Sequence, residues 1–208
     1  GAAPRADQIV ASKGFGLKAL VEGAGGRARL LPLARDTGEH LRAVFALAEG
    51  ADLILTIGGA SVGDHDLVGP VAADLGMERA FYKVAMRPGK PLMAGRLGSV
   101  PMIGLPGNPV SAMVCGHVFV VPLLRVMLGF PPAPAPRRPV RLAADVEANG
   151  PREHYMRGAI EADGFRAFAR QDSSLLSLMH AADALLVRAP HAPPARAGET
   201  HEAVVLAP

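Results

Sequence analysis

One stretch of the sequence, Thr56–Asp66, combines glycines with acidic residues directly after a continuous apolar run. We expect that run to be a buried strand, and ligands of open α/β sheets bind where such strands end. Glycines let backbone N–H groups approach a bound oxyanion, and the start of a following helix adds a favourable dipole. The candidate ligand-binding residues of this segment, the glycine turn, are Gly58, Gly59, Ser61, Gly63 and Asp64.

The glycine turn also holds two carboxylates that could bind a metal ion. Asp64 and Asp66 lie close enough in sequence for both to reach a hard cation such as Mg²⁺, with water completing its shell. The purely structural alternative is a tight connection between strand and helix, in which Asp66 would be the N-cap. The segment lacks the Gly-Lys-Ser/Thr of a P-loop and does not match Gly-x-Gly-x-x-Gly.

A second stretch, Lys83–Pro91, places Lys83, Arg87 and Lys90 around a Pro-Gly turn. A turn that presents several cations suits phosphate or molybdate, because charged N–H donors make strong hydrogen bonds to such oxygens. The alternative is a solvated surface turn, the commonest environment of lysine. We call this segment the basic turn.

A third stretch, Gly104–Ser111, joins the end of an expected strand to the start of an expected helix, and we call it the proline turn. The free N–H groups of the helix start would form a second oxyanion cradle. The alternative is an efficient connection, with Asn108 as N-cap and Pro109 at the first helical position. The candidate ligand-binding residues are Pro106, Gly107, Asn108, Pro109 and Ser111.

Taken together, the three turns indicate more than any one of them. Each follows a strand, so a parallel sheet would bring all three to one edge. The residues then predict a site for a phosphorylated or oxyanionic small molecule, with Mg²⁺ beside it. The histidines show no ligand spacing, although His65 lies in the glycine turn and could face the ligand.

Alternating helix and strand patterns in the first part of the chain predict an α/β domain, a mostly parallel sheet with helices on both faces. Asp36 and Glu39 have the spacing of a capping box, with Asp36 as N-cap. The expected helices are 13–24, 36–49, 67–75 and 108–128. The expected strands are 27–33, 51–57, 79–86, 91–94 and 100–105.

Alternating prolines in Phe130–Pro139 disfavour both helix and ladder pairing, so we expect a stiff linker there. We place a domain boundary in it, giving an α/β domain over residues 1–136 and a small, mainly β domain over residues 137–208. The expected strands of the second domain are 140–147, 154–161, 165–170, 184–188 and 202–206, with a helix over 173–180. Asp163-Gly164 suits a two-residue hairpin turn.

Composition excludes several classes of protein. The formal net charge of +3 comes from scattered residues, without the basic run that nucleic-acid binding needs. The lone Cys115 lies in an apolar run and predicts a buried, inert thiol in a reducing cytosol. The start of the sequence lacks a signal-peptide pattern. The most apolar segment is interrupted by His117 and Pro122, so we expect a core helix and a cytoplasmic protein, not a membrane span.

The order and spacing of the three turns resemble the molybdopterin molybdenumtransferase family, which includes the gephyrin E domain. The motifs are G-G-x-S-V-G-D-x-D, K-x-x-x-R-P-G-K-P and G-L-P-G-N-P-V-S. Tyr155-Met156-Arg157 and Ser174-Leu175-Leu176-Ser177 resemble the family too, so the similarity covers nearly the whole chain.

The resemblance implies a reaction and roles for residues. Adenylylated molybdopterin and molybdate would be the substrates, Mg²⁺ would assist, and AMP would be released as molybdenum is inserted. The family's functional acids match Asp36 and Asp66, while its basic contacts match Lys83, Arg87 and Lys90. Arg87 stands where many relatives carry Lys, which keeps the charge but changes its geometry. Pro106 and Pro109 would shape the proline turn.

The resemblance also implies a homodimer, partners that take up the finished cofactor, and an active-site cleft that uses two further N-terminal domains. Full-length relatives place a strand ending in Thr-Gly-Asp-Glu-Leu before the segment that matches Arg5–Val10, so we expect this strand and its acid to be absent here. The fragment could then bind ligand and turn over poorly. Two alternatives stay open: a molybdopterin adenylyltransferase, or a non-catalytic module that holds molybdopterin.

Overall fold

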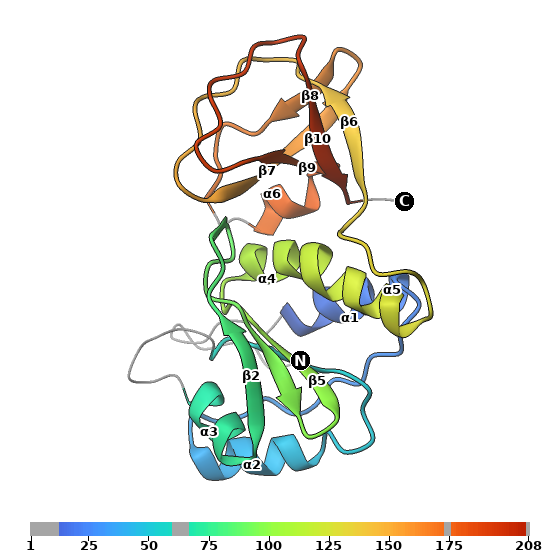
Figure 1. Cartoon of the computed structure of the whole chain (residues 1–208), viewed down its shortest axis with the longest axis vertical. Helices are drawn as coiled ribbons and strands as arrows, with labels where there is room; N and C mark the ends of the chain where they lie inside the picture. The colour runs from blue at the N-terminus through green and yellow to red at the C-terminus, as the bar shows by residue number, and fades with distance from the viewer. Residues whose placement is uncertain (1–12, 60–66, 173–175, 207–208) are drawn as a thin grey trace, which may run out of the picture.

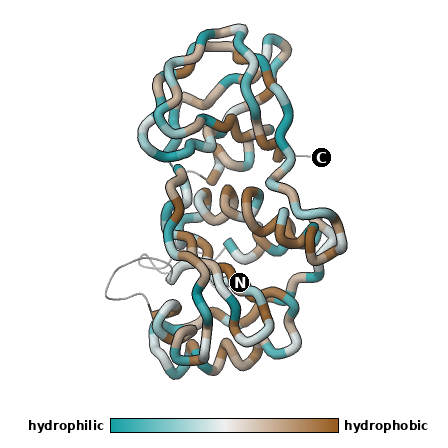
Figure 2. Tube along the Cα trace, in the orientation of Figure 1, coloured by the Kyte–Doolittle hydropathy of each residue, from teal (hydrophilic) through white to brown (hydrophobic). Residues whose placement is uncertain are grey.

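The structure is a computed structural model that describes residues 13–59, 67–172 and 176–206. The molecule is elongated, with one β-sheet at one end, a layer of helices in the middle, and another β-sheet beyond that layer whose far side is covered by two further helices (Figure 1). Hydrophobic residues concentrate in this helical layer and on the sheet faces that meet it (Figure 2).

The first sheet has the strand order β1-β5-β4-β2. Its strands are β1 Ile54–Ile57, β2 Met77–Tyr82, β4 Met93–Leu97 and β5 Val100–Leu105. The helices around it are α1 Lys13–Gly23, α2 Gly38–Ala46 and α3 Val68–Asp74. In Figure 1, α2 and α3 lie below this sheet, and α1 lies above it in the middle layer.

One long helical rod forms the rest of the middle layer. It comprises α4 Pro109–Cys115, the π-helical turn η1 Gly116–Val120 and α5 Val121–Met127. Asn108 caps it, since the Asn108 side chain accepts a hydrogen bond from the N–H of Ser111. By length and composition the rod could cross a membrane, but it packs here against both sheets and supplies much of the buried core.

The second sheet has the order β3-β7-β9-β10-β6, and β8 pairs with β7 at one side. Its strands are β3 Met86–Arg87, β6 Arg137–Arg141, β7 Glu153–Glu161, β8 Gly164–Ala167, β9 Ala184–Arg188 and β10 Thr200–Val205. The short helix α6 Leu176–His180 packs between this sheet and α4. Strand β3 comes from the basic turn, so the first part of the chain contributes an edge strand to the second sheet.

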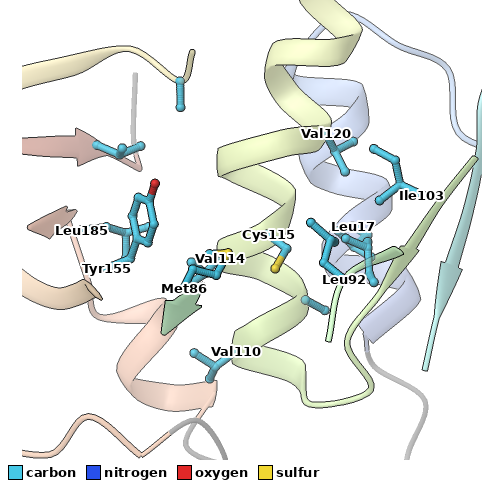
Figure 3. Close-up of a cluster of buried hydrophobic side chains, with 14 of the residues drawn as sticks. Leu17, Met86, Leu92, Ile103, Val110, Val114, Cys115, Val120, Tyr155 and Leu185 are labelled. Carbon is cyan, nitrogen blue, oxygen red and sulfur yellow. The ribbon is translucent and has the colours of Figure 1, made fainter. Parts of the chain in front are cut away.

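A single core joins the two sheets through the rod. Figure 3 shows Tyr155 and Leu185 of the second sheet on one side of α4, with Leu92 and Ile103 on the other. A smaller hydrophobic core, which includes Phe165 and Leu142, lies within the small β unit that the second sheet forms. Burial of this much aliphatic surface is the main stabilising term for both halves.

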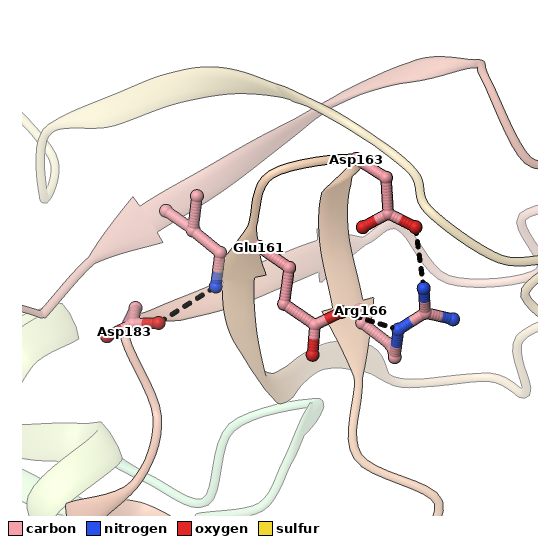
Figure 4. A network of polar contacts seen from close by, with 5 residues as sticks. Glu161, Asp163, Arg166 and Asp183 are labelled. Carbon is pink, nitrogen blue, oxygen red and sulfur yellow. Dashed lines mark hydrogen bonds and ion pairs between the residues drawn. The ribbon is translucent and has the colours of Figure 1, made fainter.

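Local contacts fix the β7–β8 hairpin at the far end of the second sheet (Figure 4). The Arg166 guanidinium contacts the carboxylates of Glu161 at 2.8 Å and Asp163 at 2.7 Å. The Asp183 carboxylate accepts a hydrogen bond from the N–H of Ile160 at 2.8 Å. The hairpin register pairs Glu161 with Gly164, so the turn residues are 162 and 163, one position before the predicted Asp163-Gly164.

The α/β class with a small β unit behind it is confirmed, but the first sheet is less parallel than predicted. Within this first sheet, β1 and β5 are the one pair of described strands that runs parallel, whereas β5–β4 and β4–β2 are antiparallel. The cause is local: Gly98 and Ser99 alone connect β4 to β5, and a two-residue connection permits only antiparallel pairing.

Two further predictions were wrong in detail. The 27–33 segment forms no strand, and its Leu33 is 76% exposed, because no described strand edge pairs with it. Thr37, not Asp36, caps α2, since the Thr37 hydroxyl accepts from the N–H of His40. Leu67 precedes α3 without a side-chain capping hydrogen bond, and the N-cap alternative for Asp66 lies outside the described residues.

The linker formed by the proline-rich stretch is also shorter than expected. Strand β6 begins at Arg137 and includes Pro139, which pairs with Glu202. Because β6 is the last strand in the sheet order, Pro139 can lack an N–H without breaking a central ladder. The predicted strand over 140–147 ends at Arg141, after which single bridges at Leu142 and Val146 continue the contact.

We expect Gly158→Ala to lower the free energy of unfolding by about 2 kcal/mol, because its β-carbon would overlap the Phe165 ring and the carbonyl of Arg166. Gly150→Ala is the matched control, since nothing lies within 4 Å of a β-carbon there, and we expect it to change stability by less than about 0.5 kcal/mol. Urea denaturation measures both variants. Equal losses would contradict the packing of β7 on β8.

Candidate anion-binding site

The glycine turn and the proline turn meet at the carboxyl ends of β1 and β5. The parallel register pairs Ile57 with Leu105, and the N–H of Gly58 donates to the carbonyl of Leu105 at 2.9 Å. A β-carbon added to Gly107 would lie 3.4 Å from the Cα of Gly58. Gly58 has a φ of +82°, which glycine adopts without strain. Glycine at both positions therefore lets the two backbones run side by side.

The basic turn is closed by backbone hydrogen bonds. The N–H of Lys83 donates to the carbonyl of Leu92 at 2.8 Å, and the N–H of Val84 donates to the carbonyl of Lys90 at 3.1 Å. The side chains of Lys83, Arg87 and Lys90 are exposed, as a site for an anion requires. Lys83 has a φ of +68°, an uncommon backbone conformation for a residue with a β-carbon.

The inner side of the basic turn rests on the helical rod. Gly89 is buried against Cys115, whose thiol lies 3.8 Å from the carbonyl oxygen of Gly89. Figure 3 shows Met86 beside this contact, on the second-sheet side of α4. Burial raises the pKa of the Cys115 thiol to about 12, so it is protonated and inert, as predicted. Cys115 packs under the turn and does no chemistry.

The three turns gather around the first half of the rod. The register of β4 and β5 pairs Met93 with Gly104, so the basic turn ends beside the strand that leads into the proline turn. Ser111 lies one helical turn before Cys115, and Cys115 supports Gly89. The basic turn and the proline turn thus both pack on the first half of the rod, and the described part of the glycine turn meets the proline turn.

The alternative interpretation of the proline turn, in which Asn108 caps the following helix, is confirmed. The Asn108 side-chain oxygen accepts from the Ser111 N–H at 3.2 Å and from the Ser111 hydroxyl at 3.4 Å. Pro106 is fully buried and Pro109 opens the helix. These residues shape the turn, and the exposed Gly107 is its open point of approach.

Some predicted site residues are not tested by these contacts. Ser61, Gly63, Asp64 and Asp66 lie outside the described residues. Asp36 is exposed just before α2, and no hydrogen bond or ion pair between described residues joins it to the three turns.

No described group of three or more His, Cys, Asp or Glu residues could hold a metal ion. The Thr56 hydroxyl, near the end of β1, is buried and has no hydrogen-bond partner among the described residues. A neutral oxygen of this kind is compatible with a hard cation but does not by itself make a site. The Mg²⁺ assignment therefore rests on Asp64 and Asp66.

Two basic residues of β7 were not among the predicted site residues: Arg157 entered only through the family resemblance, and His154 was set aside for lack of ligand spacing. Arg157 is fully buried, and its guanidinium donates to the carbonyl of Asp172 at 2.9 Å and contacts Gln171. His154 is 7% exposed and pairs with Arg87 across β3 and β7. The available signal was an arginine and a histidine in a strand whose other residues are mostly apolar.

Burial, and after it the neighbouring positive charges, shift the pKa values of two side chains of β7. Burial, followed by Arg87, Arg157 and Arg152, lowers the pKa of His154 to about 4. Burial also lowers the pKa of Arg157; Asp172 opposes this shift and Arg87 adds to it. Arg87 contributes to both pKa shifts, and the strand register places it beside His154. With the basic turn, these groups form a region suited to holding an oxyanion and stabilising its charge.

A separate groove of about 410 Å³ lies in the second sheet, lined in part by the Arg137–Glu153 ion pair, Arg188 and His201. None of the residues predicted for the site lines it. Its mixture of acids and bases does not define one class of ligand.

Comparison with known proteins gives two matches along the chain. Residues 4–126 match the family described as "Probable molybdopterin binding domain", and residues 139–206 match the MoeA C-terminal region (domain IV). The chain therefore belongs to the family of molybdopterin-binding domains, here followed by a MoeA domain IV.

The relatives carry the names of molybdenum cofactor enzymes. The chain is 35% identical to molybdopterin molybdenumtransferase 2 of Mycobacterium tuberculosis over 162 residues, covering 74% of this chain and 40% of that protein. It is 34% identical to the Nostoc molybdopterin molybdenumtransferase, covering 80% of this chain and 40% of that protein. The chain thus spans about two fifths of the length of these curated relatives.

A solved structure shares the fold. The MoeA protein of Pyrococcus horikosii matches 99% of this chain and 52% of its own, with a TM-score of 0.79 and 24% sequence identity. At that identity the likeness establishes the fold alone. It supports the arrangement of two sheets and a central rod described above.

We expect Gly89→Ala to destabilise the protein by about 3 kcal/mol, because the new β-carbon would lie 2.5 Å from the Cys115 sulfur and the φ of +109° would be strained. Gly98→Ala is the control, with a φ of +59° and open space, and should lose about 1 kcal/mol through strain alone. Thermal unfolding measures the difference. If the two losses were equal, the contact between the basic turn and the rod would be wrong.

Proposed function

We propose that this chain carries the molybdopterin-binding half of an enzyme that inserts molybdenum into molybdopterin. The substrates are adenylylated molybdopterin and molybdate, Mg²⁺ assists, and AMP is the second product. The observation that carries this proposal is the close approach of Gly58 and Gly107 beside a turn that presents exposed cations. The similarity to molybdopterin molybdenumtransferases supports it.

Each part of the site has a role in this proposal. The α/β unit, residues 1–136, binds the pterin through the backbone of the glycine and proline turns, with the β unit, residues 137–208, behind it. Lys83, Arg87 and Lys90 neutralise the phosphate or molybdate oxygens. Asp64 and Asp66 hold Mg²⁺, which would offset the negative charge of the phosphate oxygens. Asp36 acts as a further functional acid. The protein works as a cytoplasmic homodimer, and partner proteins take up the finished cofactor.

Two other functions make different predictions. A molybdopterin adenylyltransferase would form AMP–molybdopterin from ATP, and the match of residues 139–206 to a MoeA C-terminal region argues against it. A non-catalytic module would bind molybdopterin without releasing AMP. It stays a candidate because the chain matches only about two fifths of the length of its relatives.

We expect Lys90→Ala to weaken molybdate binding by about ten- to hundredfold, because one charge-assisted hydrogen bond contributes about 1.5–3 kcal/mol. Lys18→Ala is the matched control, since Lys18 is an exposed lysine of α1 that pairs with Glu22. Isothermal titration calorimetry measures both dissociation constants. Equal molybdate affinities of the two variants would show that Lys90 does not bind the anion.

We expect Asp66→Asn to abolish AMP release from adenylylated molybdopterin in the presence of molybdate and Mg²⁺, with folding intact, because the metal ion loses a charged ligand. Asp52→Asn, at an exposed position before β1, is the control and should leave AMP release unchanged. Chromatography of the released nucleotide provides the measurement. Activity that survives in Asp66→Asn would contradict the assigned metal site, and binding without AMP release in the unmodified protein would favour the non-catalytic module.

A further inference from the structure

A buried histidine of the second sheet lies next to the basic turn. Strands β3 and β7 run parallel and pair Arg87 with His154, and the N–H of Glu153 donates to the carbonyl of Ala85 at 2.9 Å. Paired residues of neighbouring strands project from the same face of a sheet, with Cα atoms about 5 Å apart. A residue of the proposed anion site and a titratable imidazole are therefore immediate neighbours.

The charges that face His154 are mostly positive. Arg87 faces it from β3, Arg152 and Arg157 act on it from its own segment, and Arg188 of β9 is its partner on the other side. The nearest acid in sequence, Glu153, directs its carboxylate to Arg137 at 3.1 Å. Asp172 acts on the Arg157 side of the cluster. In this environment protonation of the imidazole would add a further positive charge next to several arginines, which is costly. The histidine is therefore neutral in the anion-free protein.

We propose that an oxyanion bound at the basic turn is accompanied by a proton, which His154 takes up from solvent. The inference depends on the proposed function only in requiring that Arg87 contacts an anion. A dianion beside Arg87 would offset the guanidinium charges and add an attractive charge next to the imidazole. Protonated His154 would then supply a further N–H donor toward the anion from the second sheet.

The sign of the coupling follows from linkage. Without an anion, burial and the neighbouring arginines hold the pKa of His154 at about 4, so the imidazole binds almost no proton above that pH. A bound anion raises this pKa, so the complex binds more protons than the free protein. Anion affinity must then increase as the pH falls through the pKa of the complex.

The size of the change in anion affinity depends on the pKa that His154 has in the complex. If the anion restores the pKa of His154 to an ordinary value of about 6.5, affinity rises about tenfold between pH ~7.5 and pH ~5.5. Near the lower pH, close to one proton would enter with each anion. A protein without this coupling would show a flat profile for a ligand of constant charge.

Sulfate is the probe of choice, because its charge does not change over this range and the pH dependence must come from the protein. Calorimetric titrations in two buffers of different ionisation enthalpy give both the affinity and the number of protons taken up. We expect the unmodified protein to show the rise in affinity and the proton uptake. We expect His154→Asn to bind sulfate with a nearly pH-independent affinity close to the high-pH value of the unmodified protein.

His117→Asn is the matched control, since burial alone lowers the pKa of His117 to about 4 and no arginine contributes. It should keep the pH dependence. A nuclear magnetic resonance titration of the His154 ring protons, with and without sulfate, tests the same point without any substitution. An unchanged His154 pKa on saturation would overturn the proposal.

The outcomes separate this inference from the proposed function. If molybdate and sulfate both fail to bind at every pH, the anion site itself is wrong and the coupling falls with it. If they bind with affinities that do not depend on pH, or if His154→Asn keeps the full pH dependence, the site stands and only the proton coupling is wrong.

Discussion

The burial of one apolar helical rod between two sheets is the constraint on which the arrangement of this molecule depends. The rod, Pro109–Met127, contacts α1 and β5 on one side, while Tyr155 and Leu185 of the second sheet lie on the other (Figure 3). Neither sheet could leave this helix without exposing a large aliphatic surface to water. The two halves of the chain therefore share a core.

This packing explains how exposed cations are held in place. The basic turn leaves the first sheet after β2, adds β3 to the second sheet, and returns as β4. Its inner residues, Met86 and Gly89, lie against the rod, so Lys83, Arg87 and Lys90 remain at the surface. Long, mobile side chains thus start from a backbone that is fixed at both ends, which lowers the entropy cost of binding an anion.

The second sheet adds charge as well as support. His154 is buried beside its strand partner Arg87, and Arg157 is buried on the same strand, where Gln171 and the carbonyl of Asp172 accept from its guanidinium. Because Arg87 pairs with His154, the small β unit would contribute an imidazole next to the basic turn in the proposed chemistry.

Local sequence signals determined much of this protein. Asn108-Pro109 fixed the start of the rod, and the apolar run after it specified a buried helix, because capping and periodicity act over a few residues. What only the tertiary structure decided is which segments meet. The contacts of Gly58 with Gly107, of Gly89 with Cys115 and of Arg87 with His154 join positions far apart in sequence. The 27–33 segment has no partner strand in the part of the chain that the structure describes, despite its apolar residues. A strand becomes stable only when a neighbouring edge is available, and no single stretch of sequence contains that information.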